Sequence, residues 1–294
     1  MVRRLTKELG VINLGCSIRI LIALLVSACG VEAGNPDSTE EKKGFINFSI
    51  TDAPIDDVDR FMISLDRLEF GNDRTLQVDL GLDDPLDLLS LANGKKLKIL
   101  TEQEAPVGEY TQFYLILANT DQAIEAIKTD GSSAKVVILD ASGKISNELA
   151  FSGSLSLSEG ESSNLIVDVD LRQTLSLLTE EQRSTLDLDA SYEFVIRQDH
   201  SFHSESEVGA IEVEGYDSGS LICVVKAEAY TSESLPKDCS GENSQSTIVD
   251  ADNFAKILAI RPDSYSVFQV FEDSVSLIEE QAVITKGNTL TIGR

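Results

Sequence analysis

Four aspartates near the start of the chain could supply ligands to a cation. Asp52, Asp56, Asp57 and Asp59 lie in a stretch that has the character of a loop. Calcium takes six to eight oxygen ligands, often from Asp-rich loops, so these four are the first candidates for a calcium site. Their spacing does not match an EF-hand loop. A solvated loop is the alternative that we favour, and we expect no cofactor other than calcium.

The sequence contains two histidines, His200 and His203. A zinc site combines such a pair with further ligands, and the His-Ser-Phe-His spacing is compatible with one. The surrounding residues 198–207 are polar and indicate a linker. We therefore expect no metal at these histidines.

A hydrolase would need a positioned nucleophile or a pair of carboxyl groups. Ser154 and Ser220 each follow a glycine, but neither lies in the Gly-x-Ser-x-Gly sequence of a nucleophile elbow. Asp168 and Asp170 could act as an acid–base pair, although acids on the outer face of a strand are usually only solvated. We therefore expect no enzyme. A pocket that gathers two acids with shifted pKa values would instead favour a periplasmic hydrolase that uses surface carboxylates.

The first 28 residues have the order of a secretory signal. Four basic residues precede or flank an apolar run over residues 20–26, and small residues follow it. The run is far shorter than the roughly 20 apolar residues that span a membrane. A basic start, a short apolar core and small residues before a cut describe a signal peptide. A buried helix at the start of the fold is the alternative, which the flanking basic residues disfavour.

Residues Val26-Ser27-Ala28-Cys29 resemble the lipobox of bacterial lipoproteins. The resemblance implies that the chain is cut before Cys29, that its sulfur carries diacylglycerol and that its new amine is acylated. Two or three acyl chains hold a protein stably on a bilayer. Gly30 after the cysteine implies sorting to the outer membrane in a Gram-negative host. We expect a protein of the cell envelope, anchored by lipid on the periplasmic or the surface face.

The charge of the chain excludes one class of partner. There are 50 acidic and 24 basic residues, and the formal net charge is −26. Removal of residues 1–28 would take away four basic residues and one acid and make the charge more negative still. Binding to nucleic acid needs clustered Lys and Arg, so we expect no such partner.

Two cysteines remain after Cys16 and Cys29 are set aside, namely Cys223 and Cys239. An oxidising compartment would allow them to form a disulfide. Two free buried thiols are the alternative. We favour the disulfide because Cys239 lies in a polar stretch, where a free thiol would be exposed.

The periodicity of the sequence predicts strands rather than helices. In residues 165–171 apolar side chains alternate with Asp168 and Asp170, the period of a strand with one buried face. We expect further strands over residues 45–50, 61–70, 110–117, 135–139, 220–230, 254–260, 265–271, 281–284 and 290–292. Short helical turns are expected over residues 85–91, before Asn93-Gly94, and after Thr179, which opens a capping box. Many short strands with Gly and Asn/Asp turns favour β-sandwiches.

Composition places the domain boundaries. We expect a lipoprotein signal peptide over residues 1–28, a flexible tether over 29–43, a β-sandwich over 44–198, a linker over 199–207 and a second β-sandwich over 208–294. The fold class is thus mainly β, with two antiparallel, prealbumin-like or immunoglobulin-like sandwiches and a few short helices. The segments that begin at Pro106 and Pro262 resemble each other, and each places a tyrosine (Tyr110, Tyr265) where its hydroxyl can reach a nearby backbone group.

Several segments together resemble the bacterial family of domains of unknown function DUF4382. The matching segments are residues 50–54, 86–91 with Asn93-Gly94, 106–112 and 166–170. Residues 208–294 are similar to prealbumin-like, carboxypeptidase-regulatory repeats, chiefly through residues 262–271, with Ser264 in place of the usual glycine. The resemblance implies secreted or lipid-anchored sandwiches and no reaction.

These observations predict a lipid-anchored protein of the cell envelope with a non-enzymatic binding or structural role. Its sandwiches would display loops to an unknown protein or glycan partner, and the lipid on Cys29 would join it to the membrane. A calcium-binding surface adhesion module is one alternative, and the hydrolase is the other.

Overall fold

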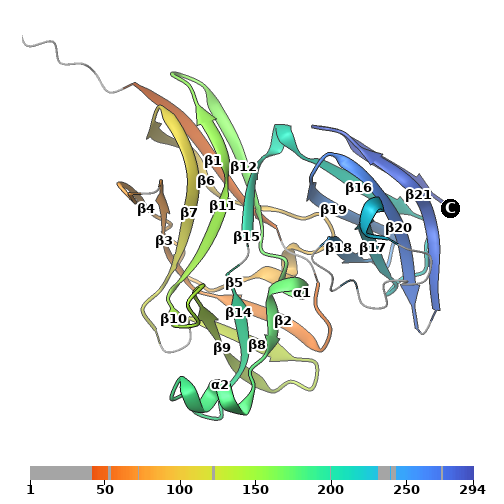
Figure 1. The fold of residues 1–294 in the computed structure, drawn as a ribbon, viewed down its shortest axis with the longest axis horizontal. Helices are drawn as coiled ribbons and strands as arrows, with labels where there is room; N and C mark the ends of the chain where they lie inside the picture. Colours follow the sequence, from red (N-terminus) through yellow and green to blue (C-terminus); the bar gives the residue numbers. More distant parts are fainter. Residues whose placement is uncertain are drawn as a thin grey trace, which may run out of the picture. The chain divides into compact units, whose positions relative to one another are not determined.

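The computed structural model describes residues 42–51, 54–71, 73–120, 123–198, 200–230, 239, 243–272 and 274–294. The expected signal peptide, Cys29 and Asp52 lie outside these residues. Residues 41–294 form one unit, built mainly of β-strands (Figure 1). Within its described residues no helix is long and apolar enough to cross a membrane.

The first lobe contains two mixed sheets. The strands of sheet 1, in spatial order, are β4 (Leu76–Asp79), β3 (Leu65–Phe70), β7 (Gly108–Leu117), β11 (Glu148–Leu157), β15 (His200–Ser204), β12 (Ser162–Asp168), β1 (Lys43–Thr51) and β6 (Leu97–Pro106). Those of sheet 2 are β13 (Leu175–Leu177), β14 (Tyr192–Arg197), β9 (Ser133–Leu139), β8 (Ile124–Lys128), β2 (Val58–Ile63) and β5 (Leu86–Asp87), with β10 (Ile145–Ser146) beside β9.

Both sheets contribute to one hydrophobic core. Phe48 of β1 and Phe61 of β2 are fully buried in the same cluster, although they lie in different sheets. Phe113 is central, because its ring lies 4.9 Å from that of Phe70 and 4.3 Å from that of Phe202, centroid to centroid. Edge-to-face rings at such distances add stabilisation beyond the burial of their area.

The second lobe is a smaller sandwich. Sheet 3 contains β19 (Phe254–Ile260), β16 (Gly209–Glu214) and β22 (Thr289–Gly293), and sheet 4 contains β18 (Ser244–Ile248), β17 (Leu221–Lys226), β20 (Asp263–Phe271) and β21 (Ser274–Ile284). Side chains of both sheets, such as Ile211 and Val267, share a second core cluster. The mainly β fold with sandwich packing is therefore confirmed. The pairs β1–β12, β11–β15, β14–β9 and β16–β22 are parallel, however, whereas antiparallel sheets were expected.

The helices are short, as expected. They are α1 (Leu171–Thr174), α2 (Glu180–Thr185) and the 3₁₀ turns η1 (Leu88–Leu91), η2 (Glu205–Glu207) and η3 (Ala227–Ala229). Thr179 and Gln182 form the predicted capping box at the start of α2. This reciprocal pair satisfies backbone N–H groups that a helix N-terminus leaves without partners.

Residues 200–204 correct one expectation. They form β15 instead of part of a linker, and β15 lies inside sheet 1 between β11 and β12 (Figure 1). Two features of the sequence concealed this strand. It is short, and its polar side chains alternate with Phe202, which is fully buried in the core.

The two tyrosines in the related segments make the same contact. The Tyr110 hydroxyl donates to the carbonyl of Pro106 at 2.6 Å, and the Tyr265 hydroxyl donates to the carbonyl of Arg261 at 2.8 Å. Each acceptor is four residues upstream, at the turn before the strand. The predicted use of the hydroxyl is confirmed in both lobes.

Candidate functional site

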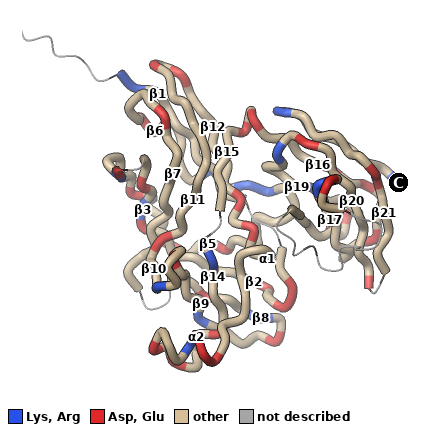
Figure 2. Tube along the Cα trace, in the orientation of Figure 1, with Lys and Arg blue, Asp and Glu red and all other residues tan. Residues whose placement is uncertain are grey.

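A polar cleft of about 290 Å³ lies where strands of the two lobes meet. The side chains that line it are mostly polar or charged, and they come from β12, α1 and β15 of the first lobe and from β17 to β20 of the second. They include Asp168, Asp170, Gln173, Ser201, His203, Lys226, Asn243, Ser244, Gln245, Arg261 and Tyr265. Both signs of charge are present, in a chain whose acids greatly outnumber its bases (Figure 2).

Asp168 and Asp170 are not solvated on an outer face, contrary to expectation. The alternation was predicted correctly, because Leu165 and Val167 point into the first core and are fully buried. The opposite face of β12 is covered as well, since Ile166 packs against Val208 and Ala259 of the following lobe. A period of two shows which side chains share a face, but it does not show that a second layer covers that face.

Hydrogen bonds fix both carboxyl groups. Asp168 accepts from the backbone N–H of Asp170 at 3.1 Å and from the side-chain amide of Gln245 at 3.3 Å. Asp170 accepts from the backbone and side-chain N–H groups of Gln173 at 3.2 and 2.5 Å, and so caps α1. Burial raises the pKa of Asp168 to about 7, helped by the neighbouring Asp170 charge, and burial raises the pKa of Asp170 to about 6.

The two histidines have different surroundings. The His200 ring lies against Phe151, with centroids 5.3 Å apart, and within the described residues neither of its nitrogens has a hydrogen-bond partner. His203 shares its Nε2 with the Ser201 hydroxyl at 3.0 Å. Burial lowers the pKa of both imidazoles to about 4, and the charge of Arg261 adds to the effect at His203. Both rings are therefore neutral near pH 7. In the described part of the chain no group of three or more His, Cys, Asp or Glu has the geometry of a metal site.

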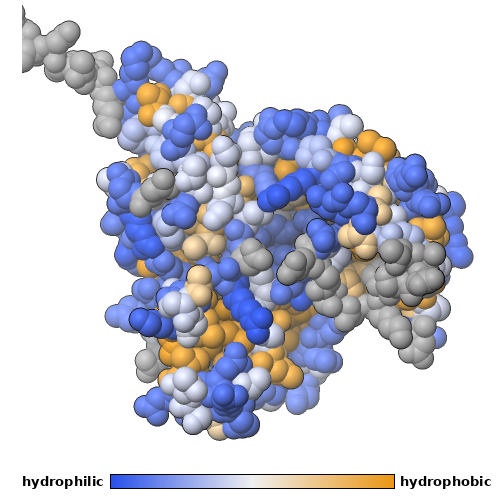
Figure 3. All heavy atoms as spheres, in the orientation of Figure 1, coloured by the Kyte–Doolittle hydropathy of each residue, from blue (hydrophilic) through white to orange (hydrophobic). Residues whose placement is uncertain are grey.

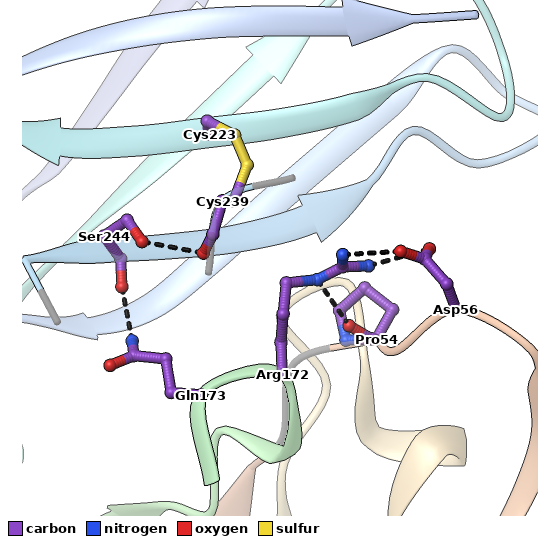
Figure 4. Close-up of a disulfide and its surroundings, with 7 residues drawn as sticks. All are labelled: Pro54, Asp56, Arg172, Gln173, Cys223, Cys239 and Ser244. Atoms are coloured by element: carbon purple, nitrogen blue, oxygen red, sulfur yellow. Dashed lines mark hydrogen bonds and ion pairs between the residues drawn. A yellow bond between two sulfur atoms is a disulfide. The ribbon is translucent and has the colours of Figure 1, made fainter. Parts of the chain in front are cut away.

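Helix α1 connects the cleft to two other features (Figure 4). On one side Arg172 binds both oxygens of Asp56, at 2.8 and 3.0 Å, and the carbonyl of Pro54 at 3.1 Å. On the other side the Gln173 amide donates to the carbonyl of Ser244 at the start of β18. The Ser244 hydroxyl in turn donates to the carbonyl of Cys239 at 2.7 Å.

Cys223 and Cys239 form the expected disulfide, with Cα atoms 5.6 Å apart. Both residues are buried and pack with Phe268, which is fully buried beneath them. The bridge thus holds the segment before β18 against sheet 4 of the second lobe.

The structure places the proposed calcium ligands differently from one another. Asp56 is exposed and paired with Arg172, and Asp57 is exposed beside it. Asp59 is also exposed, but it lies within β2 and not in the expected loop. A calcium ion would have to compete with a guanidinium for Asp56. Calcium binding by this loop therefore stays a prediction.

A second hollow, of about 410 Å³, lies beside α1 in the first lobe. Its lining combines apolar side chains, among them Ile55, Leu171, Leu175 and Phe194, with an equal number of polar or charged ones, and apolar residues gather over this part of the surface (Figure 3). Leu177 at the free edge of sheet 2 is 71% exposed.

Sequence reasoning missed Lys226, Gln245 and Arg261 as residues of the cleft. Lys226 and Arg261 lie in or next to strands that were predicted, whereas Gln245 lies in β18, a strand that was not predicted. All three belong to the second lobe, and they meet Asp168 and Asp170 only because that lobe docks against the first. The nearest signal in the sequence was Pro262, because the turn that it marks follows Arg261 directly.

The chain belongs to the DUF4382 family, domains of unknown function, whose profile matches residues 43–198. The likeness of residues 208–294 to prealbumin-like repeats stays a prediction. No curated protein matches the chain.

Solved structures resemble the chain only weakly. The TIE protein of Bacillus anthracis has 10% identity, a TM-score of 0.21 and coverage of 86% of this chain and 51% of that one. A streptococcal ancillary pilin has 10% identity, a TM-score of 0.17 and coverage of 87% and 63%. A minor pilin of Streptococcus agalactiae has 12% identity, a TM-score of 0.19 and coverage of 84% and 94%. The chain spans about half the length of the first and under two thirds of the second.

Proposed function

We propose that this protein is a binding module of the bacterial cell envelope, tethered by a lipid on Cys29, that holds a small polar ligand in the cleft. The observation that carries the proposal is the cleft, in which side chains from two lobes surround a hollow of about 290 Å³. Sites for small ligands are concave, with volumes of about 300–1,000 Å³, and most combine apolar walls with a few polar groups. This cleft is at the small end of that range and its walls are more polar, which favours a polar ligand. This volume suits a small ligand.

The disulfide supports the proposed location in the cell envelope. Structural disulfides persist in oxidising compartments and are rare in the cytosol of most organisms. The Cys223–Cys239 bridge therefore agrees with export, which the signal-like start of the chain predicts independently. Cys29→Ser should leave the precursor uncut and without label from radioactive palmitate. Normal processing of that variant would remove the lipid anchor from the proposal.

Ligand binding is tested by filling the cleft. Asn243 is an exposed residue at its rim, so Asn243→Trp should occupy the hollow without disturbing either core. We expect some members of a panel of sugars, amino acids and small carboxylates to raise the melting temperature of the wild type but not of Asn243→Trp. The matched control is Asn119→Trp, at an exposed position in a distant loop. Equal responses of all three proteins would reject the cleft as a binding site.

One observation favours a hydrolase as the second candidate. The cleft gathers Asp168 and Asp170, and their raised pKa values suit a carboxyl group that donates a proton near neutral pH. All four carboxyl oxygens already accept a hydrogen bond from the protein, however, and these bonds cap α1 and join β12 to β18. We therefore place binding first. Hydrolysis of nitrophenyl glycosides or esters that disappears in Asp168→Asn and Asp170→Asn would reverse this order.

A further inference from the structure

The basic side chains of the cleft lie on the second lobe. Lys226 ends β17 and is bound to Asp263 at 3.2 Å. Arg261 follows β19, is exposed, and has no ion-pair partner among the described residues. An arginine guanidinium presents planar, paired N–H donors, and its best partner is a carboxylate, which it can bind through two parallel hydrogen bonds.

His203 lies in the same cleft, close enough to Arg261 to respond to its charge. This charge lowers the pKa of the imidazole, in addition to the effect of burial. The Nε2 atom of His203 is hydrogen-bonded to the Ser201 hydroxyl, and no described residue hydrogen-bonds to its Nδ1 atom. The side-chain amide of Asn243, also in the cleft, makes no hydrogen bond within the described residues either. A ligand bound to Arg261 would thus find further polar partners beside it.

The opposite wall has different chemistry. The oxygens of Asp168 and Asp170 each accept one hydrogen bond from the protein, and a carboxyl oxygen has two lone pairs. They can therefore accept from donors on a ligand. A doubly charged anion would be disfavoured here, because two acids face it across a small hollow.

We propose that the cleft binds a small hydroxylated carboxylate, with its carboxylate on Arg261 and its hydroxyl groups toward Asp168 and Asp170. A sugar acid of one ring has this chemistry and suits the volume. This inference rests on the proposed function, since it names the ligand class of the same cleft.

The test compares D-glucuronate with D-glucose, which lacks the carboxylate at the same ring. The full chain, purified in detergent, contains two histidines, so ¹³C-labelled imidazole signals can be followed separately by NMR. We expect glucuronate to shift the signal of His203 and to raise its pKa, because a bound carboxylate offsets the Arg261 charge. The His200 ring also lines the cleft but is buried against Phe151, so its signal should shift less than that of His203. Glucose should bind at least tenfold more weakly.

Arg261→Gln should weaken glucuronate binding at least tenfold and abolish its advantage over glucose. Lys144→Gln, at an exposed turn residue away from the cleft, is the matched control and should change nothing. Equal binding of the two sugars, or binding of glucuronate that does not depend on Arg261, would overturn the inference and leave the proposed function standing. Absence of any His203 response to either sugar would also overturn it, and the response of Asn243→Trp to the wider panel would then decide the proposed function by itself.

Discussion

The side chain of Asn93 binds the backbone of Lys256 as a neighbouring strand would. Its oxygen accepts from the Lys256 N–H at 2.7 Å, and its nitrogen donates to the carbonyl of Phe254 at 3.3 Å and to Asp250 at 2.9 Å. Gly94 allows the close approach, because a Cβ atom there would lie 2.5 Å from Cγ of Lys256. The Asn93-Gly94 turn, part of the matched family domain, thus attaches that domain to β19 of the second lobe.

Asn93→Asp should destabilise the protein by about 2 kcal/mol. The substitution keeps the size of the side chain and the ability to adopt a positive φ (62° here), but it removes both donor bonds and places a second carboxylate beside Asp250. Urea unfolding measures the change. Asn119→Asp, in an exposed loop, is the control, and an equal loss in the two variants would mean that the contact does not hold the lobes together.

The disulfide should contribute about 3 kcal/mol to the free energy of unfolding, the value expected for a loop of this size in the chain-entropy model. A variant with both Cys223→Ala and Cys239→Ala should lose this amount. Reductant should lower the stability of the wild type to a similar level and leave the variant unchanged. A wild type that resists reductant while it shows two free thiols would contradict the prediction.

The Asp168 and Asp170 carboxyl groups should make stability fall as the pH rises from about 4 to about 7. His200 and His203, whose pKa values burial lowers from 6.5 to about 4, work in the opposite direction. The pKa values of Asp168 and Asp170 are raised in the folded protein, so the folded state binds more protons than the unfolded state in this interval. The contribution of these two carboxyl groups to the free energy of unfolding therefore decreases with pH. Asp168→Asn should remove the Asp168 contribution, so the free energy of unfolding should rise more, or fall less, with pH than in the wild type. Asp130→Asn should not have this effect, because the Asp130 pKa is lowered by its bonds to Ser132. An unchanged slope in Asp168→Asn would show that this carboxyl is not the source.

Tyr110→Phe and Tyr265→Phe should each cost about 1 kcal/mol, the usual net value of one hydrogen bond. Both hydroxyls donate to a carbonyl four residues upstream, so the two losses should be similar and additive. Tyr230→Phe, whose ring contacts Phe268, removes no hydroxyl contact of this kind and serves as the control. A large loss at one position alone would mean that the two turns are not equivalent.

Arg172 should oppose calcium binding at the acidic loop. Because the guanidinium occupies both oxygens of Asp56, millimolar calcium should raise the melting temperature of Arg172→Gln more than that of the wild type. Magnesium, which prefers a smaller and more rigid shell, is the control cation. Equal responses of both proteins to calcium would remove Asp56 from the ligand set.

The sequence predicted local structure better than it predicted contacts between segments that lie far apart in the chain. Alternation identified Leu165 and Val167 as buried, and the capping box at Thr179 is present, because both depend on neighbours within a few residues. The burial of Asp168 depends on a lobe that begins 40 residues later, which no periodicity reveals. The cleft was missed for the same reason, since Arg261 and His203 meet only when sheet 1 and the second lobe are both complete.

The position of β15 also sets an order of events during synthesis. Residues 200–204 form β15, which lies between β11 and β12 in sheet 1. This strand therefore links one half of the sheet, β4, β3, β7 and β11, to the other half, β12, β1 and β6. Both halves are synthesised before β15, and the complete sheet 1 can form only after residues up to Ser204 have left the ribosome. The family match ends at residue 198, just before this strand. A chain stopped there would carry two unpaired edges where the finished protein has the middle of a sheet, and such edges invite aggregation.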